Sequence, residues 1–316
     1  MITQYQTIIM KSLKQIGTYL CSLLLAGFIL IGCKKDDDNP TPTAKTITQT
    51  VVDDPKFSIL KAAVVKAGLA DALASGTLTV FAPDNDAFAA SGISESTINA
   101  LPVATLDSIL KYHVVAAKVM ANQVPASDTV KTLLGTNLYA SSNANGVFVN
   151  GIKVKTADVS ASNGVIHVIS KMLTPPTKTI AQIAASNADF SLLVTAVSKA
   201  GLLTAVSSAG KYTVFAPTNT AFEDAGFAND DDINNADTEL ITTVVKYHVL
   251  PTNVFASDLT NNATPTTIQG GTLTVGLSPA ANVKITGSTQ SASNITATDI
   301  IATNGVIHVI DKVLLP

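Results

Sequence analysis

The chain contains the same unit twice. The pentapeptide Thr-Val-Phe-Ala-Pro at 79–83 returns at 213–217, and Asn-Gly-Val-Ile-His-Val-Ile at 163–169 returns unchanged at 304–310. The offset between the copies grows from 134 residues at the first pair to 141 at the second, as insertions in loops would produce. A repeat of this length predicts two similar domains of about 130 to 140 residues, each with its own core.

The composition argues against a nucleic-acid partner. All 20 basic residues are Lys, so the guanidinium fork that holds phosphate through two hydrogen bonds is missing. Removal of a leader that contains Lys11 and Lys14 leaves 18 Lys against 23 Asp and Glu, a net charge of −5. An acidic protein repels polyanions, and we expect no nucleic acid among its partners.

Residues 1–32 are predicted to be a lipoprotein signal peptide. Lys11 and Lys14 precede an apolar run at 19–31, which is short for a membrane span. Its end, Leu-Ile-Gly-Cys33, resembles the lipobox of bacterial lipoproteins, in which the Cys is lipidated. We therefore expect lipidation at Cys33 and attachment to a membrane through that anchor. The alternative is an unprocessed signal-anchor helix.

Residues 33–45 are predicted to be the lipidated Cys and a flexible tether. The segment is charged and then rich in Pro and Thr, so it has little to bury. The acidic triplet at 36–38 resembles an export signal of some Gram-negative lipoproteins, which favours an outer membrane lipoprotein at the cell surface. A solvated spacer and a periplasmic location are the alternatives, and translation starts at either Met1 or Met10.

Both copies show the same succession of predicted helices and strands. Apolar residues at 57–69 and at 190–197 recur at helical spacing. The runs at 78–82 and 212–216 predict buried strands, each ended by a Pro. Asp84 or Asn85 in the first copy, and Thr218 or Asn219 in the second, are expected to cap the next helix.

Each copy then carries a Tyr-His pair, in which the His lies on an apolar helical stripe and the Tyr just beside it. Leu106, Ile109, Leu110, His113 and Val114 recur at the spacing of one helix face, as do their counterparts in the second copy, which include His248. We expect both His side chains to be buried, neutral and hydrogen-bonded.

The last repeated segment predicts a central strand. Asn163-Gly164 is typical of a hairpin turn, and residues 165–169 are apolar on both faces. His167 and its counterpart His308 fall within this strand. A buried, hydrogen-bonded His is favoured over a ligand or a catalyst, because no acid or nucleophile is fixed beside it in the sequence.

Together these segments resemble the fasciclin domain, an adhesion module. The resemblance covers 46–176 and 177–316, which we assign as fasciclin-like domains 1 and 2. The second copy carries the whole Asn-Gly-Val-Ile-His-Val-Ile-Asp-Lys-Val-Leu segment, and the first departs from it at Ser170 and Met172. The resemblance implies an α+β fold of two tandem domains, each a wedge of two small β-sheets with flanking helices.

The resemblance also names candidate partner-binding residues. In animal members of the family the Tyr-His region has been linked to integrin binding, which maps here to Tyr112, His113, Tyr247 and His248. The helical stripe favours a structural role for these residues instead.

No catalytic, cofactor-binding or metal-binding residue is predicted, and the protein is not expected to be an enzyme. The sequence lacks a nucleophile elbow, a phosphate-binding loop and a dinucleotide fingerprint. Asp230, Asp232 and Asn234 alternate as in a calcium loop, but Asn235 and Ile241 stand where Gly and Glu are required.

Two functions remain. The favoured one is cell adhesion, or binding of extracellular matrix or polysaccharide, by a membrane-anchored lipoprotein whose tandem domains bind a protein, a polysaccharide or a second copy of the chain. The alternative is a carrier of an apolar small molecule such as a lipid or pigment.

Overall fold

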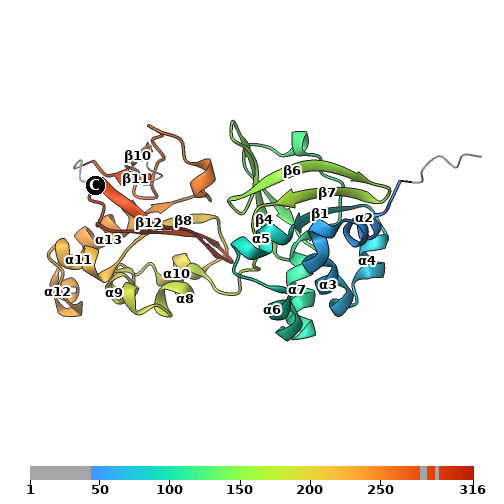
Figure 1. Ribbon diagram of the computed structural model, residues 1–316. Helices are drawn as coiled ribbons and strands as arrows, with labels where there is room; N and C mark the ends of the chain where they lie inside the picture. The colour runs from blue at the N-terminus through green and yellow to red at the C-terminus, as the bar shows by residue number, and fades with distance from the viewer. Residues whose placement is uncertain (1–43, 278–282, 289–291) are drawn as a thin grey trace, which may run out of the picture. The chain divides into compact units, whose positions relative to one another are not determined.

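The computed structural model describes residues 44–277, 283–288 and 292–316 (Figure 1). The predicted signal peptide, Cys33 and most of the tether lie outside the described residues. Within the described ranges, no helix combines the length and the apolar character needed to cross a membrane.

The first domain alternates short helices with strands. Its helices and 3₁₀ turns are α2 (Ile47–Asp53), η1 (Pro55–Phe57), α3 (Ser58–Ala67), α4 (Ala70–Ala74), α5 (Asn85–Ala90), α6 (Glu95–Ala100), α7 (Val103–Tyr112) and η2 (Ala121–Gln123). Its strands are β1 (Leu78–Pro83), β2 (Val114–Val115), β3 (Asp128–Lys131), β4 (Asn137–Asn143), β5 (Gly146–Val149), β6 (Ile152–Ala161) and β7 (Gly164–Ile169).

The strands of the first domain form two small sheets that share one strand. Their order is β2-β1-β7-β6-β5-β4-β3. β7 lies between β1, to which it is parallel, and β6, to which it is antiparallel, so the predicted central strand is confirmed. β6 pairs with β7 through residues 154–161 and with β5 through residues 152–153, and it therefore runs from one sheet into the other. The shared strand produces the wedge.

The second domain repeats this order with its own lengths. Its helices and 3₁₀ turns are α8 (Ile180–Ala185), η3 (Ala188–Phe190), α9 (Ser191–Lys199), α10 (Leu203–Ser207), α11 (Asn219–Asp224), α12 (Asp230–Asn235), α13 (Thr238–Tyr247) and η4 (Ala256–Asp258). Its strands are β8 (Tyr212–Pro217), β9 (Val249–Leu250), β10 (Thr274–Leu277), β11 (Val283–Thr286), β12 (Ala292–Ala302) and β13 (Gly305–Ile310), in the sheet order β10-β11-β12-β13-β8-β9.

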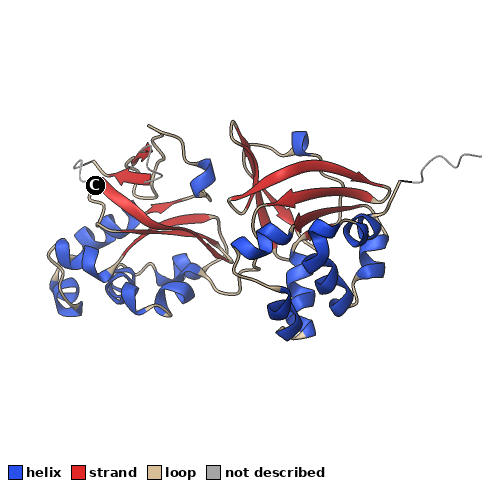
Figure 2. Ribbon diagram, in the orientation of Figure 1, coloured by secondary structure: helices blue, strands red, loops and turns tan. Residues whose placement is uncertain are grey.

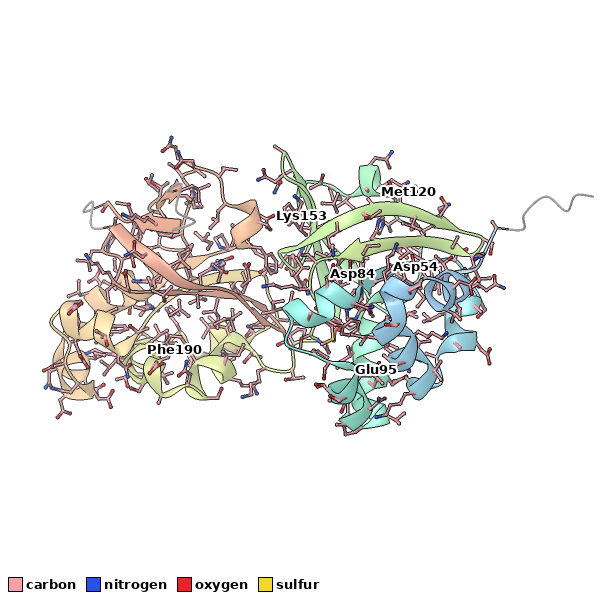
Figure 3. The ribbon with its side chains drawn as sticks, viewed as in Figure 1. Asp54, Asp84, Glu95, Met120, Lys153 and Phe190 are labelled. Atoms are coloured by element: carbon pink, nitrogen blue, oxygen red, sulfur yellow. The ribbon has the colours of Figure 1, made fainter. Side chains whose placement is uncertain are left out.

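Side-chain caps fix where the helices begin after the first strand of each copy. The Asp84 carboxylate accepts a hydrogen bond from the backbone N–H of Ala87 at 2.9 Å and caps α5. Thr218 does the same for α11. Asn85, the other candidate, instead joins α5 to α3, because its Oδ1 accepts from the N–H of Ile59. Figure 3 labels Asp84 at the start of α5 and Phe190 just ahead of α9.

Each domain has two apolar cores, one on either face of its central strand. The helices gather on one side of the strands, as Figure 2 shows. In the first domain Ile166 and Val168 of β7 pack against these helices, whereas Ile169 packs on the other face with Phe81 and Tyr112. The second domain has the equivalent pair of cores. A strand apolar on both faces is therefore buried on both faces, as its sequence predicts.

Candidate functional site

The Tyr-His pairs lie at the point where a helix turns into a strand. α7 ends at Tyr112, His113 is its C-terminal capping residue, and Val114 already belongs to β2. The prediction that the helical stripe continues through Val114 was therefore wrong for its last two residues. The N–H of His113 bonds to the carbonyl of Leu110, which tightens the last turn and ends the helix.

His113 is buried and fully hydrogen-bonded, as predicted. Its side chain is 3% exposed. Nδ1 lies 2.8 Å from the carbonyl oxygen of Ile109, to which it donates, and Nε2 accepts from the backbone N–H of Leu173 at 3.0 Å. Burial lowers the pKa of His113 to about 4, because the charged ring would lose its solvation. The imidazole is a neutral clamp between α7 and the segment after β7.

The second domain repeats this clamp. His248 donates to the carbonyl of Val244 and accepts from the N–H of Leu314 at 2.9 Å. Burial lowers its pKa to about 4 as well. In both domains the His ring therefore fixes the segment that follows the last strand. The ring is buried and is not exposed at the surface.

The tyrosines are buried on the other core. Tyr112 is 0% exposed and Tyr247 1% exposed. The Tyr112 hydroxyl donates to the carbonyl of Asn137 at 3.1 Å and accepts from Nδ2 of Asn150 at 2.8 Å. Burial raises the pKa of Tyr112 to about 12. The structure thus buries all four candidate partner-binding residues, Tyr112 and His113 within the first domain and Tyr247 and His248 within the second.

The second pair of histidines also has a structural environment. His167 Nε2 lies 2.8 Å from the carbonyl of Val119, and Nδ1 accepts from the N–H of Asp158. Its ring stacks on Phe81 at a centroid distance of 5.6 Å. His308 makes the same contacts in the second domain, and burial lowers its pKa. These rings hold a bulge of the shared strand against the central strand.

The turn before the central strand of the first domain consists of Ser162 and Asn163, since Gly164 already belongs to β7 and pairs with Ala161. Asn163 Oδ1 accepts from the N–H of Ile47, and Nδ2 donates to the carbonyl of Leu73 at 2.9 Å. Gly164 has φ of 153°, and a Cβ there would lie 1.9 Å from the carbonyl oxygen of Leu78. Glycine is required at position 164 because the backbone of β1 packs directly against it. The Asn163 side chain, in turn, fixes the start of α2.

The profile of the fasciclin domain family matches residues 55–175 and 188–316, one match in each copy of the unit. The chain belongs to the fasciclin family. The resemblance seen in the repeated segments is thereby confirmed. What those segments do in the fold is now visible, since the Tyr-His pair and the Asn-Gly strand supply the buried polar contacts of each fasciclin domain.

Known fasciclin proteins are similar to large parts of the chain. Transforming growth factor-beta-induced protein ig-h3 of Sus scrofa is 32% identical over 250 residues, which cover 76% of this chain and 35% of ig-h3. Human periostin is 28% identical over 240 residues, which cover 74% of this chain and 27% of periostin. The chain therefore matches about a third of the length of these animal relatives.

Two further matches concern a bacterial relative and a solved structure. Protein sll1483 of Synechocystis sp. is 45% identical over 139 residues, which cover 43% of this chain and 77% of that protein. A solved FAS1 domain pair from the insect cell adhesion molecule fasciclin I aligns at a TM-score of 0.43 and 20% identity, covering 85% of this chain and 96% of that chain.

The acidic cluster of the second fasciclin domain is a helix start. The side chain of Asn229 caps α12 by accepting from the N–H of Asp232 at 3.1 Å, and Asp232 Oδ2 accepts from the N–H of Asn229 in return. Thr195 donates to Asp230 at 2.6 Å. In the ranges that the structure describes, no group of three or more His, Cys, Asp or Glu side chains is arranged to hold a metal ion.

The apolar cavities beneath the helices are small. One in the first fasciclin domain, lined by Val51, Leu60 and His113 among others, measures about 20 Å³. Its counterpart in the second domain, lined by Ile180 and His248 among others, measures about 40 Å³. A water molecule needs about 10–15 Å³ measured this way, so neither cavity has room for a lipid chain or a pigment.

Sequence reasoning missed a polar hollow in the second fasciclin domain, beside Tyr247. It has a volume of about 510 Å³ and is lined by hydroxyl and amide side chains together with Gly271, Gly287 and Pro316. The available signal was the offset between the copies, which is 135 residues at Tyr112 and Tyr247 and 141 at His167 and His308. The insertions of the second copy therefore lie between these two pairs in the sequence, in the stretch that also supplies most of the residues lining the hollow.

Proposed function

We propose that the protein is a lipid-anchored adhesin of a bacterial cell surface, in which two fasciclin domains bind neighbouring cells, matrix or polysaccharide. Cys33 supplies the anchor, and residues 34–45 supply the tether. The duplication is the observation that carries the proposal, because two linked copies of one module suit binding to a repetitive surface.

The internal chemistry of the domains supports a binding role. All four histidines and both tyrosines of the Tyr-His pairs have hydrogen-bond partners inside the fold. These internal hydrogen bonds stabilise the domains. A partner would therefore contact other side chains, those exposed at the surface. Membership of the fasciclin family supports adhesion as well, since fasciclin domains are linked to cell adhesion in related proteins.

Tandem domains make a quantitative prediction for adhesion. Once the first site is bound, the second binds at the effective concentration set by the linker, and overall binding can exceed that of a single site by orders of magnitude. Deletion of residues 177–316 should therefore weaken cell adhesion far more than the loss of half of the sites would. Unchanged adhesion in a strain that lacks the whole protein would overturn the proposal.

Exposure at the surface is tested by protease treatment of intact cells. An immunoblot against the second fasciclin domain should lose its signal in intact cells, with lysed cells as the control for cleavability. A Cys33→Ser variant should be released from the membrane fraction. Protection in intact cells together with cleavage after lysis would place the domains in the periplasm and contradict the adhesion role.

A further inference from the structure

The two fasciclin domains differ in the turn that covers the buried tyrosine. In the first domain β5 is joined to β6 by Asn150 and Gly151 alone. Asn150 is 3% exposed. Its Nδ2 donates to the Tyr112 hydroxyl, and its Oδ1 accepts from the backbone N–H of Tyr139 at 2.8 Å. The Asn150 side chain therefore covers the hydroxyl end of the Tyr112 side chain.

A longer connection takes the place of this turn in the second domain. Five residues, 287–291, separate β11 from β12, whereas two separate β5 from β6. Residues 289–291 lie outside the described residues. The backbone N–H of Ser288 donates to the Tyr247 hydroxyl at 3.0 Å, which is the bond that Asn150 makes in the first domain. A hollow of about 510 Å³ opens beside it.

The floor of the hollow is rigid. The Tyr247 hydroxyl donates to the carbonyl of Thr272 at 2.7 Å in addition to the bond from Ser288. A Cβ on Gly287 would lie 2.5 Å from the carbonyl oxygen of Leu315 and 3.2 Å from the Tyr247 ring. The backbone thus packs directly against the ring, and Tyr247 is held on both sides. Because these residues are already held in place, the protein loses less conformational entropy when a ligand binds.

The walls carry hydroxyl and amide groups. The lining side chains include Gln269, Thr272, Thr274, Thr286 and Ser288. Within the described parts of the chain, the hydroxyl groups of these three Thr and of Ser288 make no hydrogen bond to another residue. Gln269 Oε1 accepts from the N–H of Gly271 at 2.8 Å, which orients its amide. None of the side chains that line the hollow is charged.

This chemistry selects among classes of ligand. A phosphate or carboxylate needs a cation or several aligned N–H groups, and none of the lining side chains is cationic. An apolar molecule would bury the wall hydroxyls without partners, which costs free energy. A saccharide unit presents hydroxyls that both donate and accept, as Thr and Ser hydroxyls do. The volume falls in the range of roughly 300–1,000 Å³ that is typical of small-molecule sites.

We propose that the hollow beside Tyr247 binds a neutral saccharide unit, so that the second fasciclin domain is the polysaccharide-binding half of the pair. The proposal rests on the adhesive function given above and names its ligand class. In the first domain the Asn150 side chain occupies the corresponding position beside the Tyr112 hydroxyl.

Calorimetric titration of the purified full-length protein with cellotriose, maltotriose and laminaritriose tests the proposal, and trigalacturonate serves as the acidic probe. The test variant is Thr272→Val/Thr274→Val, which keeps side-chain shape and removes two hydroxyls from exposed positions. Val suits a strand at least as well as Thr does, so the fold is expected to persist. The matched control is Thr296→Val/Thr298→Val, on exposed positions of β12 that do not line the hollow.

We expect at least one neutral trisaccharide to bind, the test variant to bind it at least about tenfold more weakly, and the control to bind it unchanged. Absence of binding by all three neutral probes, preference for trigalacturonate, or equal affinity of the two variants would overturn the saccharide site. Adhesion assays separate this failure from that of the proposed function. A deletion strain that loses adhesion while the purified protein binds no trisaccharide refutes the saccharide site alone.

Discussion

Acidification should destabilise the first fasciclin domain through His113. Its folded-state pKa is lowered from 6.5 to about 4 by burial. Between these values the unfolded chain binds a proton that the folded domain excludes, so stability falls as the pH decreases. The full difference is worth about 3 kcal/mol, and the loss between pH 7 and pH 5 is about 2 kcal/mol.

The structure explains why the proton is excluded. Nε2 of His113 accepts the N–H of Leu173, so a proton on Nε2 would place two donors face to face. The surroundings are apolar and the ring is 3% exposed, so water cannot take over. Carboxylates with lowered pKa, such as Asp54 and Asp311, titrate below 3.8 and do not contribute to the loss between pH 7 and pH 5.

Scanning calorimetry at pH 7 and pH 5 tests this with His113→Gln, which removes the titration and keeps a polar side chain. The transition of the wild-type first domain should fall by roughly 6–8 °C between the two pH values. The variant should start from a lower melting temperature at pH 7 but lose markedly less on acidification. His248→Gln is the matched control, since it acts on the second domain. An equal pH-dependent loss in His113→Gln and wild type would refute the reasoning.

Two further substitutions address the turn before the central strand. Gly164→Ala should destabilise the first domain by several kcal/mol or prevent its folding, because the new methyl group would overlap the carbonyl of Leu78; a melting temperature within a degree or so of wild type would contradict this. Asn163→Ala should cost about 2 kcal/mol in urea unfolding, because the N–H of Ile47 and the carbonyl of Leu73 lose their partners; an unchanged midpoint would show that water replaces both bonds.

The repeated segments made most of the fold predictable. Identical residues at 163–169 and 304–310 required identical environments, and their apolar character on both faces predicted a central strand. The buried state of the four histidines followed from the same patterns. Helix caps were predictable to within one residue, because Asp, Asn and Thr all suit the position.

Other features depended on contacts that no local pattern encodes. The end of α7 at Tyr112 is set by the pairing of Val114 with Val80, which lies far back in the chain. Tyr112, the last residue of α7, packs in the second core with Phe81 and Ile169. The hollow beside Tyr247 is formed by the end of one helix, two strands, two connecting segments and Pro316.

The sequence by itself determined that there are two fasciclin domains, which strand of each is buried on both faces, and that the histidines belong to the interior. Periodicity and repetition encode these properties because they depend on local geometry and on which side chains avoid water. Only the tertiary structure decided what the two copies do differently. The second domain has a hollow beside Tyr247, whereas in the first domain the Asn150 side chain donates to the Tyr112 hydroxyl. Whether space beside a buried side chain is open or filled depends on residues far apart in the sequence, which meet only in the folded chain.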